Sequence, residues 1–281
     1  MFKFNFSSAD DQHRARAEKY QSSDKIESYS PLTSLYKFNL VDVRHVEHIL
    51  EESDHENFKN LTDALELKSD VVKGVYEGGL KIWECTVDLL TYLSKESFNF
   101  TGLDVLDLGC GAGILGLNAI KNGAASVHFQ DYNSEVLELV TIPNVLLNID
   151  GNKPEQLDNT NKLKFFAGDW GSLCGKLGVY DVVLTSETIY SPANYNKLIN
   201  IFNTVLKKTG VIYVAAKQHY FGVGGNTRQF EQLLHKHKWE TSVCFCSEEG
   251  LKSNLNRLLI FGCKEASKNL HLTMRTVLIS M

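Results

Sequence analysis

A short apolar strand that runs directly into a glycine-rich turn is the strongest constraint on the fold of this chain. After residues 104–108, glycines occupy alternate positions, at Gly109, Gly111 and Gly113. Glycine permits a tight turn and allows the backbone to come close to a ligand. A strand followed by such a turn is typical of the nucleotide-binding end of a Rossmann-like unit. The pattern therefore predicts an α/β sheet with a nucleotide site.

Asp107, near the end of this strand, separates two classes of nucleotide cofactor. The spacing Gly111-x-Gly113-x-x-Gly116 also fits a dinucleotide fingerprint. A carboxylate at the strand end would repel a pyrophosphate, whereas it can pair with the cationic amino group of a methionine moiety. Asp107 therefore favours S-adenosylmethionine, and a nicotinamide-dependent dehydrogenase ranks lowest among the functions considered.

Strands and helices alternate along the rest of the chain. This alternation predicts a mostly parallel sheet covered by helices on both faces, and the last two strands, with no helix between them, predict an antiparallel edge hairpin. We expect Ser134 to cap a helix and Pro143 to interrupt it. Strands are expected at 71–76 (or a hairpin arm), 104–108, 126–130, 163–167, 180–184, 210–216, 240–247 and 255–263, and helices at 57–67, 84–94, 114–122, 134–141, 144–148, 194–206 and 227–237.

Four regions are expected along the 281 residues. Residues 1–30 are polar and predicted to be flexible, although alternating Phe2, Phe4 and Phe6 can form a short added strand. Residues 31–70 are expected to be an extension that packs on the core, residues 71–265 the main α/β domain, and residues 266–281 a tail of undefined structure.

Composition narrows the class of protein. The net charge of −5 gives no basic field for sequence-specific nucleic-acid binding. No apolar run approaches the roughly 20 residues of a membrane span, and we expect no secretory signal because the chain is polar after Phe6. The six cysteines lack zinc-ligand spacing, so we expect reduced thiols in an intracellular protein and no metal. The acidic run at 47–56 favours a solvated helix face over a docking surface for a basic partner.

Polar residues follow the next strands, where ligands of open α/β sheets bind. Asp131 can accept the ribose hydroxyls of either cofactor. Asp169 can accept from an adenine amino group, with Trp170 as a flat wall, or Gly168 and Asp169 form only a turn. Taken together, the three loops favour S-adenosylmethionine.

The loop after strand 180–184 is expected to lie nearest the reacting end of the cofactor. It contains Ser186 and Glu187. Glu187 is either a helix-capping acid or a carboxylate that orients or deprotonates the methyl acceptor.

Several longer motifs resemble a known family. From about residue 71 to 263, the chain resembles the seven-strand protein-histidine methyltransferases. The stretches 76–86 and 219–225 are the most specific part of this resemblance. The other motifs lie at 106–113, 128–133 and 184–190, with a further similarity at Phe4–Phe6.

The resemblance implies a seven-strand Rossmann-like fold and methylation of the tau nitrogen of one histidine in the third large-subunit ribosomal protein. It also implies a cytoplasmic and nuclear enzyme, and we expect a monomer. From the residues alone, Trp83 would have been assigned to the core. The resemblance places these residues around the cofactor: Ile82, Trp83, Glu84, Cys85, Thr86, Gly109, Gln130, Asp131, Tyr132, Gly168, Asp169, Trp170 and Ser186.

A histidine acceptor requires little acid–base catalysis, because neutral imidazole is abundant near pH 7. Glu187 or a nearby carbonyl can hold the proton on the other ring nitrogen. Tyr190 and Tyr220 flank the imidazole or simply pack, and His219 is a base or, more often for such a residue, a structural hydrogen-bonding group. Two alternatives stay open: a lysine methyltransferase of the same fold, and a non-catalytic cofactor-binding assembly module.

Overall fold

The chain divides into two compact units. The first contains Met1–Ile82, Asn99–Gly102 and Asp107–Asp169, and the second contains Trp83–Phe98, Leu103–Leu106 and Trp170–Met281. The acidic run at 47–56 and the tail at 266–281 lie outside the described residues, and the four regions expected from the sequence stay a prediction. No helix in the described ranges is long and apolar enough to cross a membrane. The computed structural model describes residues 2–4, 26–29, 38–43, 46, 58–67, 69–149, 162–246 and 256–262.

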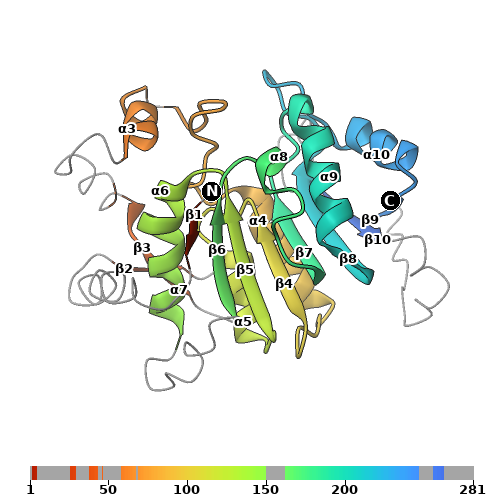
Figure 1. The fold of residues 1–281 in the computed structure, drawn as a ribbon, viewed down its shortest axis with the longest axis horizontal. Helices are drawn as coiled ribbons and strands as arrows, with labels where there is room; N and C mark the ends of the chain where they lie inside the picture. Colours follow the sequence, from red (N-terminus) through yellow and green to blue (C-terminus); the bar gives the residue numbers. More distant parts are fainter. Residues whose placement is uncertain are drawn as a thin grey trace. The chain divides into compact units, whose positions relative to one another are not determined.

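Four strands form the main sheet of the first unit (Figure 1): β1 (Phe2–Phe4), β6 (Leu163–Ala167), β5 (Ser126–Asp131) and the end of β4 (Asp104–Leu108), in that order. Strand β5 is parallel to β6, whereas β1 pairs with β6 in the antiparallel sense. Nearly every residue of β4 and β5 is buried, as is typical of parallel strands covered on both faces. The short N-terminal strand expected from the sequence is therefore confirmed.

The first unit also contains a second, two-stranded sheet, which an asparagine of α7 ties to its neighbours. Strands β2 (Ile26–Tyr29) and β3 (Phe38–Val41) pair in the antiparallel sense. Asn144 on α7 (Ile142–Asn148) accepts from the Val41 backbone N–H at 2.8 Å, and its amide donates to the Ala112 carbonyl at 3.0 Å. These bonds satisfy backbone groups that burial would otherwise leave unpaired.

The helices of the first unit differ from expectation around Pro143. Ser134 does not cap the helix; Asn133 occupies the N-cap position, and its side chain instead bonds to Glu77 and Val75. Pro143 lies in the first turn of α7 and does not break the helical path, because a π-helical turn precedes α7 and a first-turn proline needs no N–H partner. The helices are α3 (Lys59–Glu66), α5 (Ile114–Lys121), α6 (Ser134–Val136), the π turn η1 (Leu137–Thr141) and α7.

The prediction of a strand or hairpin arm at residues 71–76 is wrong. This segment is a turn closed by one bridge between Val72 and Tyr76. Gly74 has a φ of +77°, and its N–H donates to the Glu77 carboxylate at 2.7 Å. The left-handed glycine reverses the chain here, so the apolar residues on either side of it do not form an extended strand.

The second unit contains an antiparallel edge, as expected. Its strand order is β4-β7-β8-β10-β9; β7 and β8 are parallel, whereas β10 is antiparallel to both neighbours. Among the described residues, eight strands are assigned to the main sheet, so the expected count of seven is not confirmed. The new strands are β7 (Tyr180–Ser186), β8 (Leu206–Lys217), β9 (Glu240–Cys246) and β10 (Asn256–Gly262).

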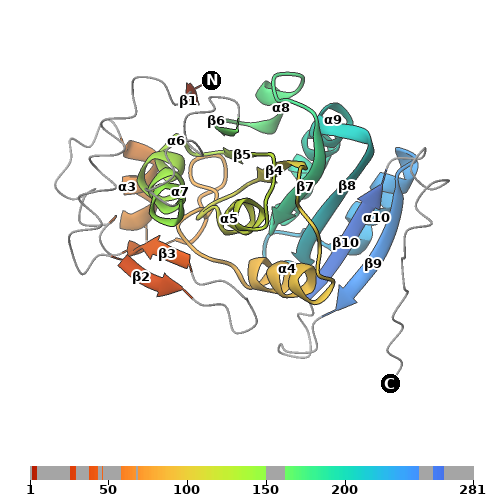
Figure 2. The same ribbon diagram turned by 90° about the horizontal axis from the view of Figure 1, so that it is seen from below.

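Helices cover both faces of the second unit's strands, with α4 on one side and α9 on the other (Figure 2). Helix α9 forms because Tyr195, Leu198, Ile199 and Phe202 recur at helical spacing and are all buried. The helical segments are α4 (Glu84–Lys95), α8 (Trp170–Leu173), the 3₁₀ turn η3 (Pro192–Asn194), α9 (Tyr195–Val205) and α10 (Thr227–Lys236).

Candidate functional site

The glycine loop after β4 has the left-handed backbone that its sequence predicts. Gly109, Gly111 and Gly113 have φ values of +68°, +49° and +75°. A Cβ at Gly111 would stand 3.1 Å from the Gly79 carbonyl oxygen, so this position is closely packed as well as left-handed. Side chains are therefore disfavoured at these positions, which is why the loop is built from glycine.

The end of β5 fixes this loop through side-chain hydrogen bonds. The Asp131 carboxylate accepts from the N–H of Gly111 at 2.9 Å and from that of Asn133 at 3.1 Å. Gln130 is fully buried; it accepts weakly from Gly109 N–H at 3.4 Å and donates to the Gly168 carbonyl at 3.0 Å. Gln130 and Asp131 therefore tie the loops after β4 and β6 to the end of β5.

Asp107 is only 1% exposed, and its Oδ2 accepts from the Gly116 N–H at 2.8 Å. Burial raises the pKa of Asp107 to about 8, and burial raises that of Asp131 to about 6. Asp107 thus holds the start of α5 against the strand end. Its pairing with a ligand's amino group stays a prediction.

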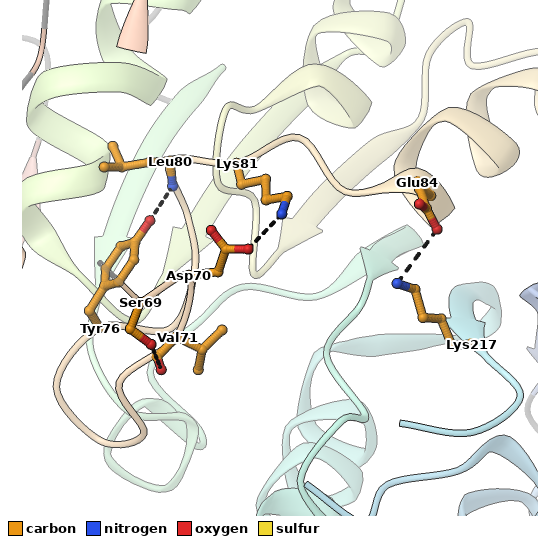
Figure 3. Close-up of polar contacts among 8 residues, drawn as sticks. All are labelled: Ser69, Asp70, Val71, Tyr76, Leu80, Lys81, Glu84 and Lys217. Atoms are coloured by element: carbon orange, nitrogen blue, oxygen red, sulfur yellow. Dashed lines mark hydrogen bonds and ion pairs between the residues drawn. The ribbon is translucent and has the colours of Figure 1, made fainter. Parts of the chain in front are cut away.

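The segment before Ile82 also contacts this region of the first unit. The Leu80 N–H donates to the Tyr76 hydroxyl at 2.8 Å, and Lys81 forms an ion pair with Asp70 at 2.6 Å (Figure 3). The Tyr132 hydroxyl donates to the Gly74 carbonyl at 2.9 Å. The Tyr132 side chain is therefore fixed by a hydrogen bond to the turn at residues 71–76.

In the second unit, the start of α4 meets the ends of β7 and β8. The Thr86 hydroxyl donates to Ser186 Oγ at 3.1 Å. Lys217 Nζ lies 3.5 Å from the Glu84 carboxylate (Figure 3) and 5.8 Å from the centroid of the Trp83 ring. Trp83 is only half-buried, so the assignment of Trp83 to the core is wrong.

Glu187 at the end of β7 has an unusual environment. Its φ is +59°, and its N–H donates to the Ala215 carbonyl at 2.9 Å. The side chain is 8% exposed, yet among the described residues neither carboxylate oxygen has a hydrogen-bond partner of good geometry. A left-handed non-glycine residue with an unsatisfied buried carboxylate is costly, and such cost is typical of functional sites.

Three groups surround this carboxylate. Burial raises the pKa of Glu187, while the Cys85 thiol, the Tyr220 hydroxyl and the Lys217 ammonium oppose the rise. Burial also raises the pKa of both Cys85 and Tyr220. Because the thiol and the hydroxyl stay protonated, both present donors to Glu187, although neither is aligned for a formed hydrogen bond.

The remaining predicted residues are only partly brought together. Tyr190 and Tyr220 meet edge to face, with ring centroids 6.4 Å apart. His219 is exposed, and its backbone pairs with Asn226. Asp169 and Trp170 are half-buried at the start of α8. The structure thus groups Tyr190 and Tyr220 with Glu187, while the roles of His219, Asp169 and Trp170 stay predictions.

Comparisons with known proteins identify relatives of this chain. A sequence profile of a family described as lysine methyltransferase matches residues 59–236. Histidine protein methyltransferase 1 of Saccharomyces cerevisiae is 32% identical over 262 residues, covering 71% of this chain and 68% of that protein. The chain belongs to the histidine protein methyltransferase family. This membership agrees with the expectation of a methyltransferase that uses S-adenosylmethionine.

Other members of this methyltransferase family are more similar in sequence. The Bos taurus homolog of histidine protein methyltransferase 1 is 46% identical over 208 residues, covering 66% of this chain and 56% of that protein. The Dictyostelium discoideum homolog is 42% identical over 169 residues, covering 59% of this chain and 52% of that protein. The chain therefore spans just over half the length of these curated relatives.

Lys217 is a residue of the candidate site that the sequence analysis did not predict. It is the last residue of β8, after the apolar run 211–216. The rule that ligands lie beyond the carboxyl ends of strands would have found it. In the part of the chain that the structure describes, no group of three or more His, Cys, Asp or Glu residues is arranged to hold a metal ion.

Proposed function

We propose that this chain transfers a methyl group from S-adenosylmethionine to the tau nitrogen of a histidine. We further propose that the substrate is a large-subunit ribosomal protein, the third of that subunit. The names of the relatives supply the histidine acceptor, and the resemblance at 76–86 and 219–225 supplies the ribosomal substrate. The observation that carries the proposal is the buried Glu187 carboxylate, which makes no well-aligned hydrogen bond to the described residues.

The residues of the first unit fit the cofactor. The glycine loop at 109–113 allows the close approach of a ligand, and Asp131, which accepts from the N–H groups of Gly111 and Asn133, retains lone pairs for ribose hydroxyls. When bound, S-adenosylmethionine supplies a methyl group made electrophilic by its sulfonium sulfur. The sulfur leaves as a neutral atom, so the protein needs no acid at that position and contributes mainly alignment.

Glu187 fits the role of a tautomer-fixing acceptor. A histidine ring attacks through the nitrogen that lacks a proton, so attack by the tau nitrogen requires the proton on the other nitrogen. A buried carboxylate oxygen without a partner is suited to accept that N–H. Glu187 would thereby orient the ring and disperse the positive charge that develops as the methyl group is transferred.

Tyr190 and Tyr220 are suited to flank the acceptor ring. Their edge-to-face contact places two aromatic groups beside the Glu187 loop. Aromatic faces pack against imidazole and attract the methylimidazolium cation that forms in the reaction. Because neutral imidazole is abundant at pH 7, this mechanism needs no further base, and exposed His219 has no required role in it.

A labelled transfer assay tests the proposal. The purified protein is incubated with methyl-labelled S-adenosylmethionine and the large-subunit ribosomal proteins of cells that lack the enzyme, and the labelled band is hydrolysed. We expect methylhistidine in one protein. Absence of label while the cofactor still binds would favour a non-catalytic assembly module.

A lysine acceptor is the second candidate, because the matching family profile is described as lysine methyltransferase. A lysine must lose a proton before it attacks, and a carboxylate with a raised pKa could accept it. Methyllysine in the hydrolysate would support this candidate. We also propose a monomer with a cytoplasmic and nuclear distribution, which sedimentation and fluorescence imaging test directly.

A further inference from the structure

The loop at residues 219–226 exposes two large apolar side chains. Phe221 is 71% exposed and Val223 is 51% exposed. Gly222 and Gly224 have φ values of +82° and +87°, so the chain turns sharply on both sides of Val223. Neighbouring apolar side chains exposed on a turn are costly in water, and such groups commonly mark a surface that another molecule covers.

The base of this loop is firmly fixed. The Tyr220 N–H donates to the Gly225 carbonyl at 2.8 Å, and the Gly224 N–H donates to the Tyr220 carbonyl at 3.0 Å. At the end of the loop, the Asn226 N–H donates to the Tyr195 hydroxyl at 2.9 Å. The exposed tip is therefore carried by an ordered turn, which lowers the entropic cost of binding through it.

The same loop is pressed against the segment that follows Glu187. The Gly225 N–H donates to the Tyr190 carbonyl at 2.9 Å. A Cβ on Gly225 would overlap the carbonyl oxygens of Ile189 and Tyr190, so only glycine allows this approach. Phe221 directly follows Tyr220, and the Tyr220 hydroxyl is one of the groups that oppose the rise in the pKa of Glu187. The exposed tip is therefore next in sequence to a residue of the candidate site.

We propose that Phe221 and Val223 form a docking tip for the protein substrate, contacting apolar side chains beside the acceptor residue. This inference rests on the proposed function and adds how the acceptor chain is held. Residues 219–226 contain no Lys, Arg, Asp or Glu. The tip therefore offers no charge to nucleic-acid phosphates, and an apolar segment of a polypeptide is the occupant that its chemistry fits.

Steady-state methyl transfer to the large-subunit ribosomal proteins tests the docking tip. The double variant Phe221→Ser, Val223→Ser should raise the apparent KM for these proteins about tenfold or more, with kcat within about twofold of wild type, because the tip contributes binding rather than chemistry. Affinity for S-adenosylhomocysteine, measured by calorimetry, should not change. An unchanged apparent KM would overturn the proposal.

Leu67→Ser and Val179→Ser are matched controls, since these side chains are 66% and 56% exposed elsewhere on the molecule. Both should leave the apparent KM unchanged; an equal rise in either would show a general effect of surface polarity and overturn the proposal. Flotation of the wild type, but not of the double variant, with phosphatidylcholine vesicles would instead assign the tip to a membrane.

Photocrosslinking separates this inference from the proposed function. With p-benzoylphenylalanine in place of Phe221, the crosslinked polypeptide should be the one that receives the methyl label. If that polypeptide is labelled on lysine, the histidine assignment fails while the docking tip stands. If label appears on histidine but the crosslink is on a different polypeptide, the docking tip fails and the proposed function stands.

Discussion

Three buried carboxylates at strand ends have different environments, and this difference separates their roles. Asp107 and Asp131 each accept from backbone N–H groups, so they hold loops in place. Glu187 is also buried, but its carboxylate makes no well-aligned hydrogen bond among the described residues, although the Cys85 thiol and the Tyr220 hydroxyl lie near it. Glu187 is therefore the carboxylate suited to bind a group that the protein itself does not provide.

Glu187→Gln should lower kcat by about 100-fold, because an amide has no charge to hold the imidazole proton and stabilise the developing cation. The affinity for S-adenosylhomocysteine should stay within about twofold of wild type. Transfer kinetics and calorimetry measure the two quantities. The exposed Glu66→Gln on α3 is the control, and a kcat for Glu187→Gln equal to that of Glu66→Gln would refute the acceptor role.

Gly109→Arg should abolish cofactor binding with little loss of fold, because an arginine side chain would cover the loop backbone that the cofactor approaches. Gly102 is a matched control, since it is also left-handed, at +76°, with open space around a Cβ. Gly102→Arg should bear a similar backbone cost yet retain binding. Calorimetry with S-adenosylhomocysteine, alongside circular dichroism, decides; equal affinities for the two variants would contradict the loop assignment.

Asp107 should make stability depend on pH. Its pKa is about 8 in the folded chain and lower when unfolded, so the folded state holds the proton more tightly. The contribution of Asp107 to stability is therefore fully present below the pKa of the unfolded state and is lost as the pH rises through about 8. Between pH 6 and 9, the Tm should fall more for wild type than for Asp107→Asn. The exposed Asp63→Asn should follow wild type, and parallel curves for all three would rule out this contribution.

At the scale of elements, Asn144 of α7 supplies a hydrogen-bond acceptor to the backbone of β3. Asn144→Ala would leave the Val41 N–H and the Ala112 carbonyl unsatisfied, so we expect a loss of about 2–4 kcal/mol in the free energy of unfolding. Asn122→Ala, at the more exposed end of α5, should cost less than about 1 kcal/mol. Urea denaturation measures both, and equal losses would show that the β3 contact contributes nothing.

The sequence predicted most strands and helices because hydrophobic periodicity reports burial. The Val71–Tyr76 turn was missed, since Gly74 and the Glu77 side chain, rather than periodicity, reverse the chain there. The path through Pro143 was missed because a π-helical turn leaves no periodic signal. In the site, strand-end rules located Asp131 and Glu187, whereas the contact of Lys217 with Trp83 depends on tertiary packing.

At the scale of the whole molecule, charge has a supporting role in substrate binding. With a net charge of −5, the chain would attract a basic protein substrate only weakly, and salt would screen that attraction. Selection of one acceptor residue must therefore come from local contacts, namely the Glu187 carboxylate, the Tyr190–Tyr220 pair and the apolar tip at Phe221 and Val223.

The most direct test of the account is the position of the methyl group on the product ring. Hydrolysed product is separated by chromatography against tau- and pi-methylhistidine standards. An acceptor oxygen that holds the pi-nitrogen proton predicts tau-methylhistidine alone. Pi-methylhistidine, a mixture of the two isomers, or methyllysine would contradict the role assigned to Glu187.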